Sequence, residues 1–96
     1  MDTLSFIKEN RLLINSLAKR CKAENPRIFG SVANLTDNEK SDIDVLVDPM
    51  PGATLFDLGA LQQELERVLG RRVDVLTPND LPKKFKQKVL QAAIAI

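Results

Sequence analysis

Residues 27–47 constrain this chain more than any other stretch, because they place two carboxylates on a short apolar strand. An apolar run ends at Gly30 and Ser31, a polar stretch follows, and the segment closes with the sequence Ser-Asp-Ile-Asp-Val-Leu-Val. Successive side chains on a strand point to opposite faces, so Asp42 and Asp44 share one face and the alternating apolar residues share the other. The pattern predicts two acids held side by side on a rigid support.

Such a pair requires a partner, because adjacent carboxylates repel each other and apolar neighbours keep them partly desolvated. Aspartate oxygens suit Mg2+, which takes its ligands from water, a few carboxylates and substrate phosphates. Upstream, Gly30 and Ser31 end a strand and open a predicted short helix. The free N–H groups of that turn, the close approach that glycine permits and the serine hydroxyl all favour a phosphate. A metal and a phosphorylated ligand are therefore expected at one place.

A third acid, Asp74, lies in the β-branched sequence Arg-Arg-Val-Asp-Val-Leu of residues 71–76. If this strand lies beside residues 42–47, Asp74 reaches the same site while Val73 and Val75 turn to the core. Three carboxylates would then surround one or two ions.

Each acid taken singly has a purely structural explanation. Asp42 follows Ser41 at the start of a strand, Asp44 could face solvent on an edge strand, and Asp74 could pair with Arg71 or Arg72. The combination with the glycine-serine turn favours a nucleotide and metal site over this explanation.

Together these residues resemble the nucleotidyltransferases of the DNA polymerase beta superfamily. The resemblance rests on Gly30 and Ser31, ten intervening residues, the Asp42-Ile43-Asp44 motif and the later Asp74. The small size is similar to that of the prokaryotic minimal nucleotidyltransferases, which are usually paired with a HEPN-domain partner. The resemblance implies an α/β minimal nucleotidyltransferase fold, with a small mixed β-sheet and flanking helices, over residues 1–96 as a single domain.

The resemblance also implies roles for these residues. Asp42 and Asp44 would hold Mg2+ on the triphosphate of ATP, and Gly30 and Ser31 would bind its phosphates. Asp74 would complete a site for a second Mg2+ and assist deprotonation of the attacking hydroxyl. The implied catalytic and metal-binding residues are thus the three aspartates.

The family further implies an antitoxin that transfers AMP to a tyrosine of a HEPN ribonuclease toxin. One departure is Asn34, which stands where the family commonly has an arginine; Lys40, Arg71 or Arg72 are candidates for the missing charge. Two alternatives stay open. The chain could be a binding-only antitoxin with an unused site, or a catalytic subunit acting on RNA or a small-molecule acceptor.

Composition narrows the class of protein. Its 96 residues fit one modest core, so recognition of the second substrate is expected to involve another subunit, in a homo- or hetero-oligomer. A net charge of +1, with four Phe and no Trp or Tyr, disfavours nucleic acid as a direct partner. The absence of His predicts that a metal would be bound by oxygen ligands, and the single Cys favours a cytoplasmic location. No apolar run approaches the roughly 20 residues that span a bilayer, so no membrane partner is expected.

The remaining pattern predicts three longer helices, at residues 3–23, 55–69 and 83–93. The first is expected to carry an apolar stripe that includes Leu12 and Leu13 and to be stopped by Asn25 and Pro26. Thr54 and Gly70 should cap the second.

Several surface features are also predicted. The acids of loop 36–40, and Glu64 and Glu66 on the second helix, are expected to be solvated. Phe85 should face the core beneath a lysine-rich helix face, and the apolar tail, residues 92–96, could either cover the sheet or dock on a partner. The order of elements implies an α/β domain with a small mixed sheet.

Overall fold

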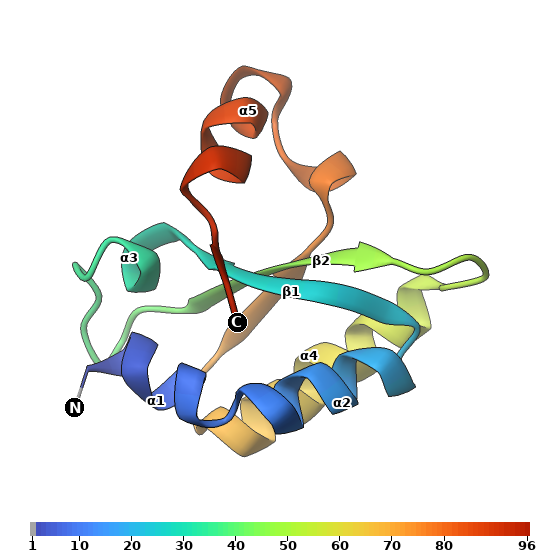
Figure 1. The fold of residues 1–96 in the computed structure, drawn as a ribbon, viewed down its shortest axis with the longest axis horizontal. Helices are drawn as coiled ribbons and strands as arrows, with labels where there is room; N and C mark the ends of the chain where they lie inside the picture. The colour runs from blue at the N-terminus through green and yellow to red at the C-terminus, as the bar shows by residue number, and fades with distance from the viewer. Residues whose placement is uncertain (1) are drawn as a thin grey trace.

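The computed structural model describes residues 2–96, which form a four-stranded mixed sheet with helices on both faces (Figure 1). In chain order the elements are α1 (Thr3–Glu9), α2 (Arg11–Arg20), β1 (Ala23–Phe29), α3 (Gly30–Ala33), β2 (Ile43–Pro49), α4 (Leu55–Leu69), β3 (Val73–Leu76), the 3-10 turn η1 (Pro78–Asp80), α5 (Lys83–Ala92) and β4 (Ile94–Ala95). The strand order is β3-β2-β1-β4. Strands β2 and β3 are parallel, whereas β1 is antiparallel to both β2 and β4. The expected α/β fold with a small mixed sheet is confirmed.

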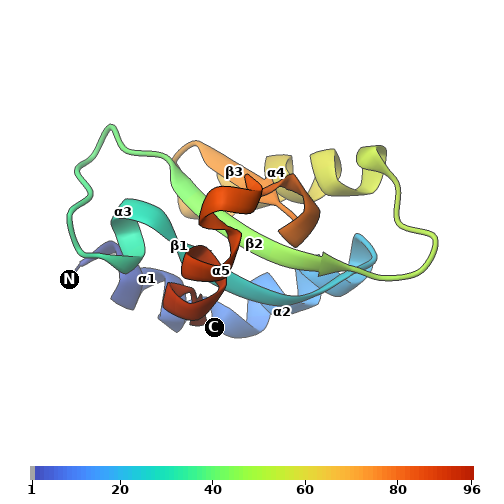
Figure 2. The same ribbon diagram turned by 90° about the horizontal axis from the view of Figure 1, so that it is seen from above.

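The helices form two unequal layers around this sheet. Helices α1, α2 and α4 lie beneath β1 and β2 in Figure 1, and α5 lies on the opposite side, over the same strands in Figure 2. Within residues 2–96, no helix is long and apolar enough to cross a membrane.

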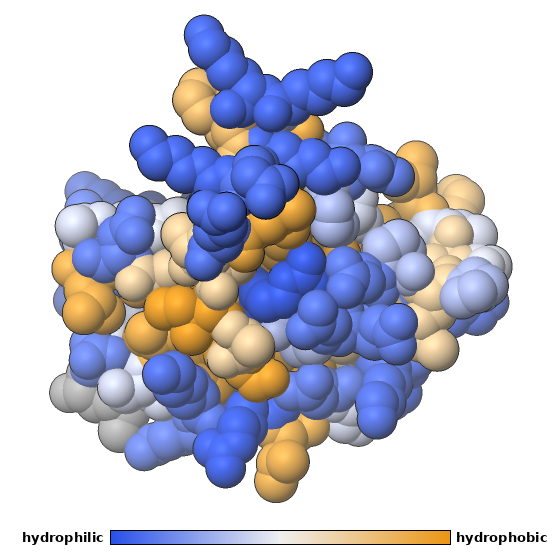
Figure 3. All heavy atoms as spheres, turned by 45° about the horizontal axis from the view of Figure 1, so that its top comes forward, coloured by the Kyte–Doolittle hydropathy of each residue, from blue (hydrophilic) through white to orange (hydrophobic). Residues whose placement is uncertain are grey.

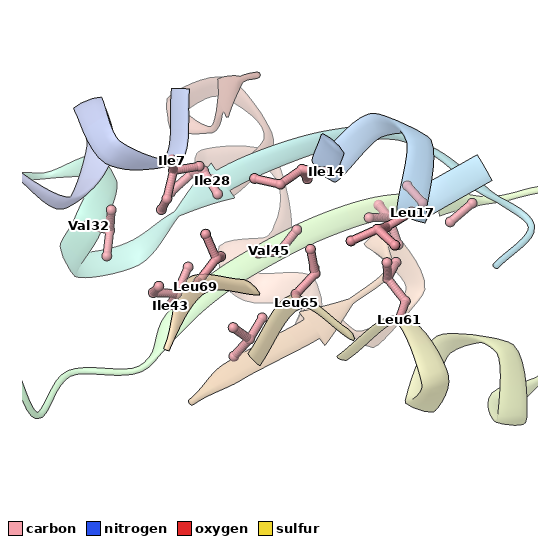
Figure 4. Close-up of a cluster of buried hydrophobic side chains, with 14 residues drawn as sticks. Ile7, Ile14, Leu17, Ile28, Val32, Ile43, Val45, Leu61, Leu65 and Leu69 are labelled. Carbon is pink, nitrogen blue, oxygen red and sulfur yellow. The ribbon is translucent and has the colours of Figure 1, made fainter. Parts of the chain in front are cut away.

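The main core lies between the sheet and the larger helical layer. Ile43, Val45 and Val47 of β2 are buried in it, together with apolar side chains of α2 and α4 (Figure 4). The alternation predicted for β2 is therefore correct, and Asp44 points away from this core. Leu46, on the same face as Asp44, is also fully buried but lies outside the main cluster.

The prediction of one continuous helix over residues 3–23 is wrong, because the chain breaks at Asn10. Its backbone N–H donates to the Ile7 carbonyl (3.0 Å) and its side-chain amide donates to the Phe6 carbonyl (2.9 Å). An Asn that bonds locally to the backbone in this way ends a helix turn readily. The break reorients the second segment, so Leu12 and Leu13 are 81% and 45% exposed instead of buried.

Asn25 and Pro26 do not end this helix either, since both lie inside β1. The ladder with β2 shifts register between Glu24 and Arg27, and Asn25 adopts a positive φ of 53°. Such a bulge tolerates a proline, because the bulged residues do not need to donate to the ladder.

Helix α4 has the predicted bounds and also protects the edge strand β3. Thr54 and Asp57 form a reciprocal capping box, and Gly70 ends the helix with φ 71°. Glu66 and Gln62 accept hydrogen bonds from the backbone N–H groups of Val73 (3.0 Å) and Val75 (3.1 Å). The expectation that Glu66 is solvated is thus wrong, because its carboxylate satisfies a donor on an open sheet edge.

The C-terminal segment adds an edge strand to the sheet. Helix α5 ends at Ala92, and β4 then pairs with β1 through Arg27 with Ala95 and Ile28 with Ile94. Phe85 is 53% exposed, so its predicted place in the core is wrong; α5 has no fully buried residue. The tail, expected either to cover the sheet or to dock on a partner, instead joins the sheet as its edge strand.

We expect Glu66→Ala to lower the free energy of unfolding by about 1–2 kcal/mol, because it leaves the Val73 N–H in a half-buried site without an acceptor. Urea unfolding followed by circular dichroism measures this, since the chain has no Trp or Tyr for fluorescence. Glu64→Ala is the matched control on the same helix, because Glu64 pairs with the exposed Arg67 and loss of such a surface pair should cost little. Equal effects of the two substitutions would contradict this role.

Candidate active site

The structure brings the three predicted aspartates to one face of the sheet. Asp44 of β2 and Asp74 of β3 are register partners in the parallel ladder. Adjacent strands lie about 4.8 Å apart, and register partners project to the same face. Asp42 stands immediately before β2, two residues from Asp44 and so on the same side. Side chains far apart in the sequence thus meet because Val73 packs into the core beside Ile43.

The three acids differ in exposure. Asp44 is half-buried on a central strand, Asp42 is partly exposed and Asp74 is exposed. Burial raises the pKa of the Asp44 carboxyl above its usual value of 3.8, and the negative charges of Asp74 and Asp42 raise it further. The ionised form of Asp44 is therefore disfavoured in the absence of a positive charge. A bound cation would stabilise it.

The structural explanations for Asp44 and Asp74 do not hold, whereas Asp42 does stand at the start of a strand as its explanation states. Asp44 lies on a central strand and not an edge strand. Arg72 pairs with Asp42 at 3.8 Å and is 85% exposed on its side chain, whereas Asp74 takes part in none of the ion pairs formed within residues 2–96. An exposed pair of this length contributes little to stability, so it leaves the Asp42 carboxylate available.

The carboxylates have the chemistry of a magnesium site but an open arrangement. In the part of the chain that the structure describes, no three Asp, Glu, Cys or His side chains converge closely enough to hold a metal ion by themselves. Mg2+ commonly binds through one or two carboxylates with substrate phosphates and water completing its shell. The donor set fits an ion that arrives with a phosphorylated substrate better than an ion held permanently.

Gly30 forms the wall of the site beside Asp44. It has φ 72°, and a Cβ at this position would lie 2.3 Å from Asp44 Oδ2. The antiparallel pairing of Phe29 with Asp44 creates this close approach. Glycine is required here both for its backbone conformation and for space.

Ser31 follows in the first turn of α3, and its side chain is partly exposed. Its carbonyl accepts the Thr36 N–H at 2.9 Å, which fixes the turn and leaves the hydroxyl on the side chain as a donor. The predicted phosphate-binding turn and the predicted acids are therefore neighbours through Gly30 and Asp44.

Arg71 organises the loop that leads into Asp42, and sequence reasoning missed this role. Its guanidinium donates to Thr3 Oγ1 (2.9 Å), Asp37 Oδ2 (3.2 Å) and the carbonyls of Asn38 (3.0 Å) and Ser41 (2.6 Å). Asp37 also accepts the Thr3 hydroxyl at 2.7 Å. The expectation of a fully solvated loop is thus wrong for Asp37.

This network has two consequences for the site. Arg71 is committed to the loop, so it does not supply the charge that Asn34 lacks. It holds the Ser41 carbonyl, so it fixes the backbone directly before Asp42. No short sequence motif reveals it, because its partners lie up to 68 residues away in the chain.

Two clefts border these features. The larger, of about 540 Å3, lies around Arg71 and Asp37 and contains none of the three aspartates. A second, of about 370 Å3, lies between α3 and α5 and includes Gly30 in its wall. None of the three aspartates lines the second cleft either, but its wall includes Gly30, where an added Cβ would meet Asp44. We therefore place the candidate site beside the second cleft.

A small mixed sheet that presents three aspartates beside a glycine-serine turn defines a nucleotidyltransferase. The chain belongs to the polymerase beta nucleotidyltransferase family, whose model matches residues 11–96.

Named relatives agree with this assignment. The chain is 46% identical over 69 residues to a proposed protein adenylyltransferase of Methanocaldococcus jannaschii, covering 72% of this chain and 74% of the relative. It is 32% identical over 69 residues to the protein adenylyltransferase MntA of Thermococcus cleftensis, covering 72% and 70%.

Solved structures share the fold. A proposed minimal nucleotidyltransferase superposes with a TM-score of 0.83 at 38% identity, covering 100% of this chain and 95% of that one. A toxin–antitoxin structure with AMP-PNP matches with a TM-score of 0.71 at 24% identity, covering 91% and 70%. The second likeness supports the fold only.

We expect Gly30→Ala to lower the free energy of unfolding by more than Gly70→Ala and to weaken binding of Mg2+ with nucleotide. Both glycines have nearly the same φ, 72° and 71°, but only a Cβ at position 30 meets another atom within 4 Å. The shared backbone strain costs about 1–2 kcal/mol, and the excess at position 30 measures the contact with Asp44. Thermal unfolding and calorimetric titration make the comparison; equal losses for the two variants would refute the contact.

The Asp37 network predicts a pH dependence of stability. The Thr3 hydroxyl bonded to Asp37, and then the Arg71 guanidinium beside it, hold the pKa of that carboxyl below its usual 3.8. A lowered folded-state pKa stabilises the fold above the ordinary pKa, and this stability is lost as the pH falls through the folded-state value. Asp37→Asn should therefore be less stable than wild type at pH 7, by about 1.5 kcal/mol, and the difference should shrink below about pH 3.8.

Glu39→Gln is the control for this measurement, because Glu39 is an exposed acid in the same loop. Urea unfolding at a series of pH values should show no comparable difference for it. A constant gap between wild type and Asp37→Asn at every pH would contradict the role of the Asp37 charge.

Proposed function

We propose that the chain is the antitoxin of a HEPN/MNT toxin–antitoxin pair and a protein adenylyltransferase, which transfers AMP from ATP to a tyrosine hydroxyl of the HEPN ribonuclease toxin with Mg2+. The observation that carries the proposal is the register pairing of Asp44 with Asp74 beside Gly30. Support also comes from relatives named protein adenylyltransferases and from similar folds described as toxin–antitoxin structures, including MntA–HepT. Residues 1–96 would act as one minimal nucleotidyltransferase domain in the cytoplasm.

The chain's own groups would divide the work as follows. The backbone N–H groups at the start of α3 and the Ser31 hydroxyl bind phosphate oxygens of ATP. The toxin's tyrosine oxygen attacks the α-phosphorus, the new O–P bond forms, and the bond to the β-phosphate oxygen breaks so that pyrophosphate leaves with the electron pair. The exposed Asp74 carboxylate receives the tyrosine proton. Asp42 and Asp44 would hold Mg2+, which when bound would attract the triphosphate to this face and orient it for attack.

The proposed residues for Mg2+ are Asp42, Asp44 and Asp74, and the proposal takes them to hold two ions with the substrate phosphates. When bound there, the ions would stabilise charge on the entering and leaving oxygens. The raised pKa of Asp44 is consistent with this, because a nearby cation favours the charged carboxylate that binding requires.

A binding-only antitoxin is the second candidate, and Asn34 motivates it. Asn34 is exposed at the end of α3 and supplies no positive charge to the site. Transfer to RNA or a small-molecule acceptor is a third candidate function. No contact within residues 2–96 directly supports it.

The deciding experiment is intact-mass spectrometry of the candidate HEPN partner after incubation with this protein, Mg2+ and ATP. We expect the partner to gain whole AMP units. The variant Asp42→Asn/Asp44→Asn should reduce the rate by more than about 100-fold, because it removes two of the proposed metal ligands while keeping side-chain shape.

Asp48→Asn is the matched control. Asp48 lies on β2 on the same face as Asp44, but it pairs with Arg27 at 3.2 Å and is outside the cluster. It should retain transfer. A stable complex that gains no AMP with wild-type protein would support the binding-only antitoxin, and label on RNA or a small molecule but never on protein would support the third candidate function.

A further inference from the structure

The negative charge of the proposed site exceeds the positive charge of the two proposed ions. Three aspartates and a nucleotide triphosphate bring more negative charge together than the two proposed ions remove. Other nucleotide sites complete this balance with lysine or arginine side chains that contact phosphate oxygens. A cationic side chain near Gly30 would reduce this excess of negative charge and strengthen nucleotide binding if the proposed function is correct.

The cations predicted from sequence do not supply this side chain. Arg71 is bound to Asp37 and to the loop carbonyls. Arg72 points to Asp42 from a mainly exposed position, 3.8 Å from its carboxylate. Lys40 is exposed in the loop and lines neither cleft described above.

The cleft between α3 and α5 contains a different candidate. Its wall combines Gly30 and Asn34 with Phe85, Lys88 and Val89 of α5. Lys88 is the cationic residue of this wall, is exposed, and takes part in none of the ion pairs formed within residues 2–96. Figure 3 shows hydrophilic side chains projecting from the end of the molecule that carries α5, with hydrophobic surface exposed beside them.

The surroundings of Lys88 favour contact with an anion. The cleft adjoins the carboxylate cluster through Gly30, whose Cα faces Asp44. Phe85 and Val89 make part of the cleft apolar, which strengthens an ion pair formed there relative to one in open water. The long, flexible lysine stem also allows the ammonium group to reach from α5 across the cleft.

We propose that Lys88 is a nucleotide-binding residue that contacts the phosphates of ATP from α5 and supplies the positive charge absent at Asn34. The inference rests on the proposed function, because it takes the ligand to be a nucleotide triphosphate with Mg2+. It assigns to this chain a phosphate contact from a helix on the far side of the cleft from the glycine-serine turn. The cleft between α3 and α5 is then part of the nucleotide site.

The test is calorimetric titration of the full chain with AMP-PNP and Mg2+. Lys88→Ala should bind about tenfold more weakly, the usual size of one lost hydrogen bond to a charged group, and Lys88→Arg should stay close to wild type. Lys83→Ala is the matched control, since Lys83 is an exposed lysine of the same helix about 140° around from Lys88 and outside the cleft.

A charge-relocation variant separates phosphate contact from a general effect on folding. Asn34 has φ −84° and ψ −1°, a conformation that arginine adopts without strain. Asn34→Arg returns a cation to the opposite wall of the same cleft, so Lys88→Ala/Asn34→Arg should recover most of the lost affinity. A structural role for Lys88 would not be rescued in this way.

The outcomes distinguish this inference from the proposed function. Equal binding by Lys88→Ala and Lys83→Ala would overturn the role of Lys88 while leaving adenylyl transfer intact. Nucleotide binding that depends on Lys88, without AMP transfer to any protein, would support this inference and overturn the proposed function. A wild-type chain that binds no nucleotide would overturn both.

Discussion

The parallel register of β2 and β3 is the constraint on which the site depends. It sets Asp44 opposite Asp74, and it is fixed by the buried face of the same strands, where Ile43 and Val73 pack in the core. A slip of one residue would move the acids into the core and the apolar residues to the surface. Hydrophobic burial on one face therefore holds together charges that repel on the other. The placement of the aspartates and the packing of the core therefore depend on the same pair of strands.

This arrangement costs stability when no cation is bound. The pKa of Asp44 lies above its usual value because of burial and the charges of Asp74 and Asp42, so the folded state disfavours the ionised form. A ligand that binds only the folded chain returns this free energy by mass action. Under the proposed function, Mg2+ with nucleotide would then stabilise the fold as well as complete the site.

Sequence patterns correctly predict the features of the fold that depend on residues close together in the chain. The alternation around Asp44, the capped helix ending at Gly70 and the strand carrying Asp74 follow from side-chain period and turn chemistry, and the structure agrees with them. The role of Arg71 could not be predicted, because its bonds to Thr3 and to the loop join parts of the chain that only the fold brings together. The helical spacing of apolar residues predicts a continuous helix through Asn10. The helix breaks there because the Asn10 side chain hydrogen-bonds to the local backbone, and a single Asn in the sequence does not reveal this.

The different exposure of Asp44 and Asp74 indicates what kind of acceptor substrate fits the proposed site. Asp44 is half-buried against Gly30, whereas Asp74 lies on the edge strand β3 and is exposed. A hydroxyl that approaches Asp74 therefore comes from open solvent and is not enclosed by this chain. An enclosed pocket selects a small molecule by its shape, but an open edge leaves selection to a second surface that docks beside it. Under the proposed function, a protein side chain presented by a bound partner would satisfy this geometry, because the partner would supply both the hydroxyl and the contacts that orient it.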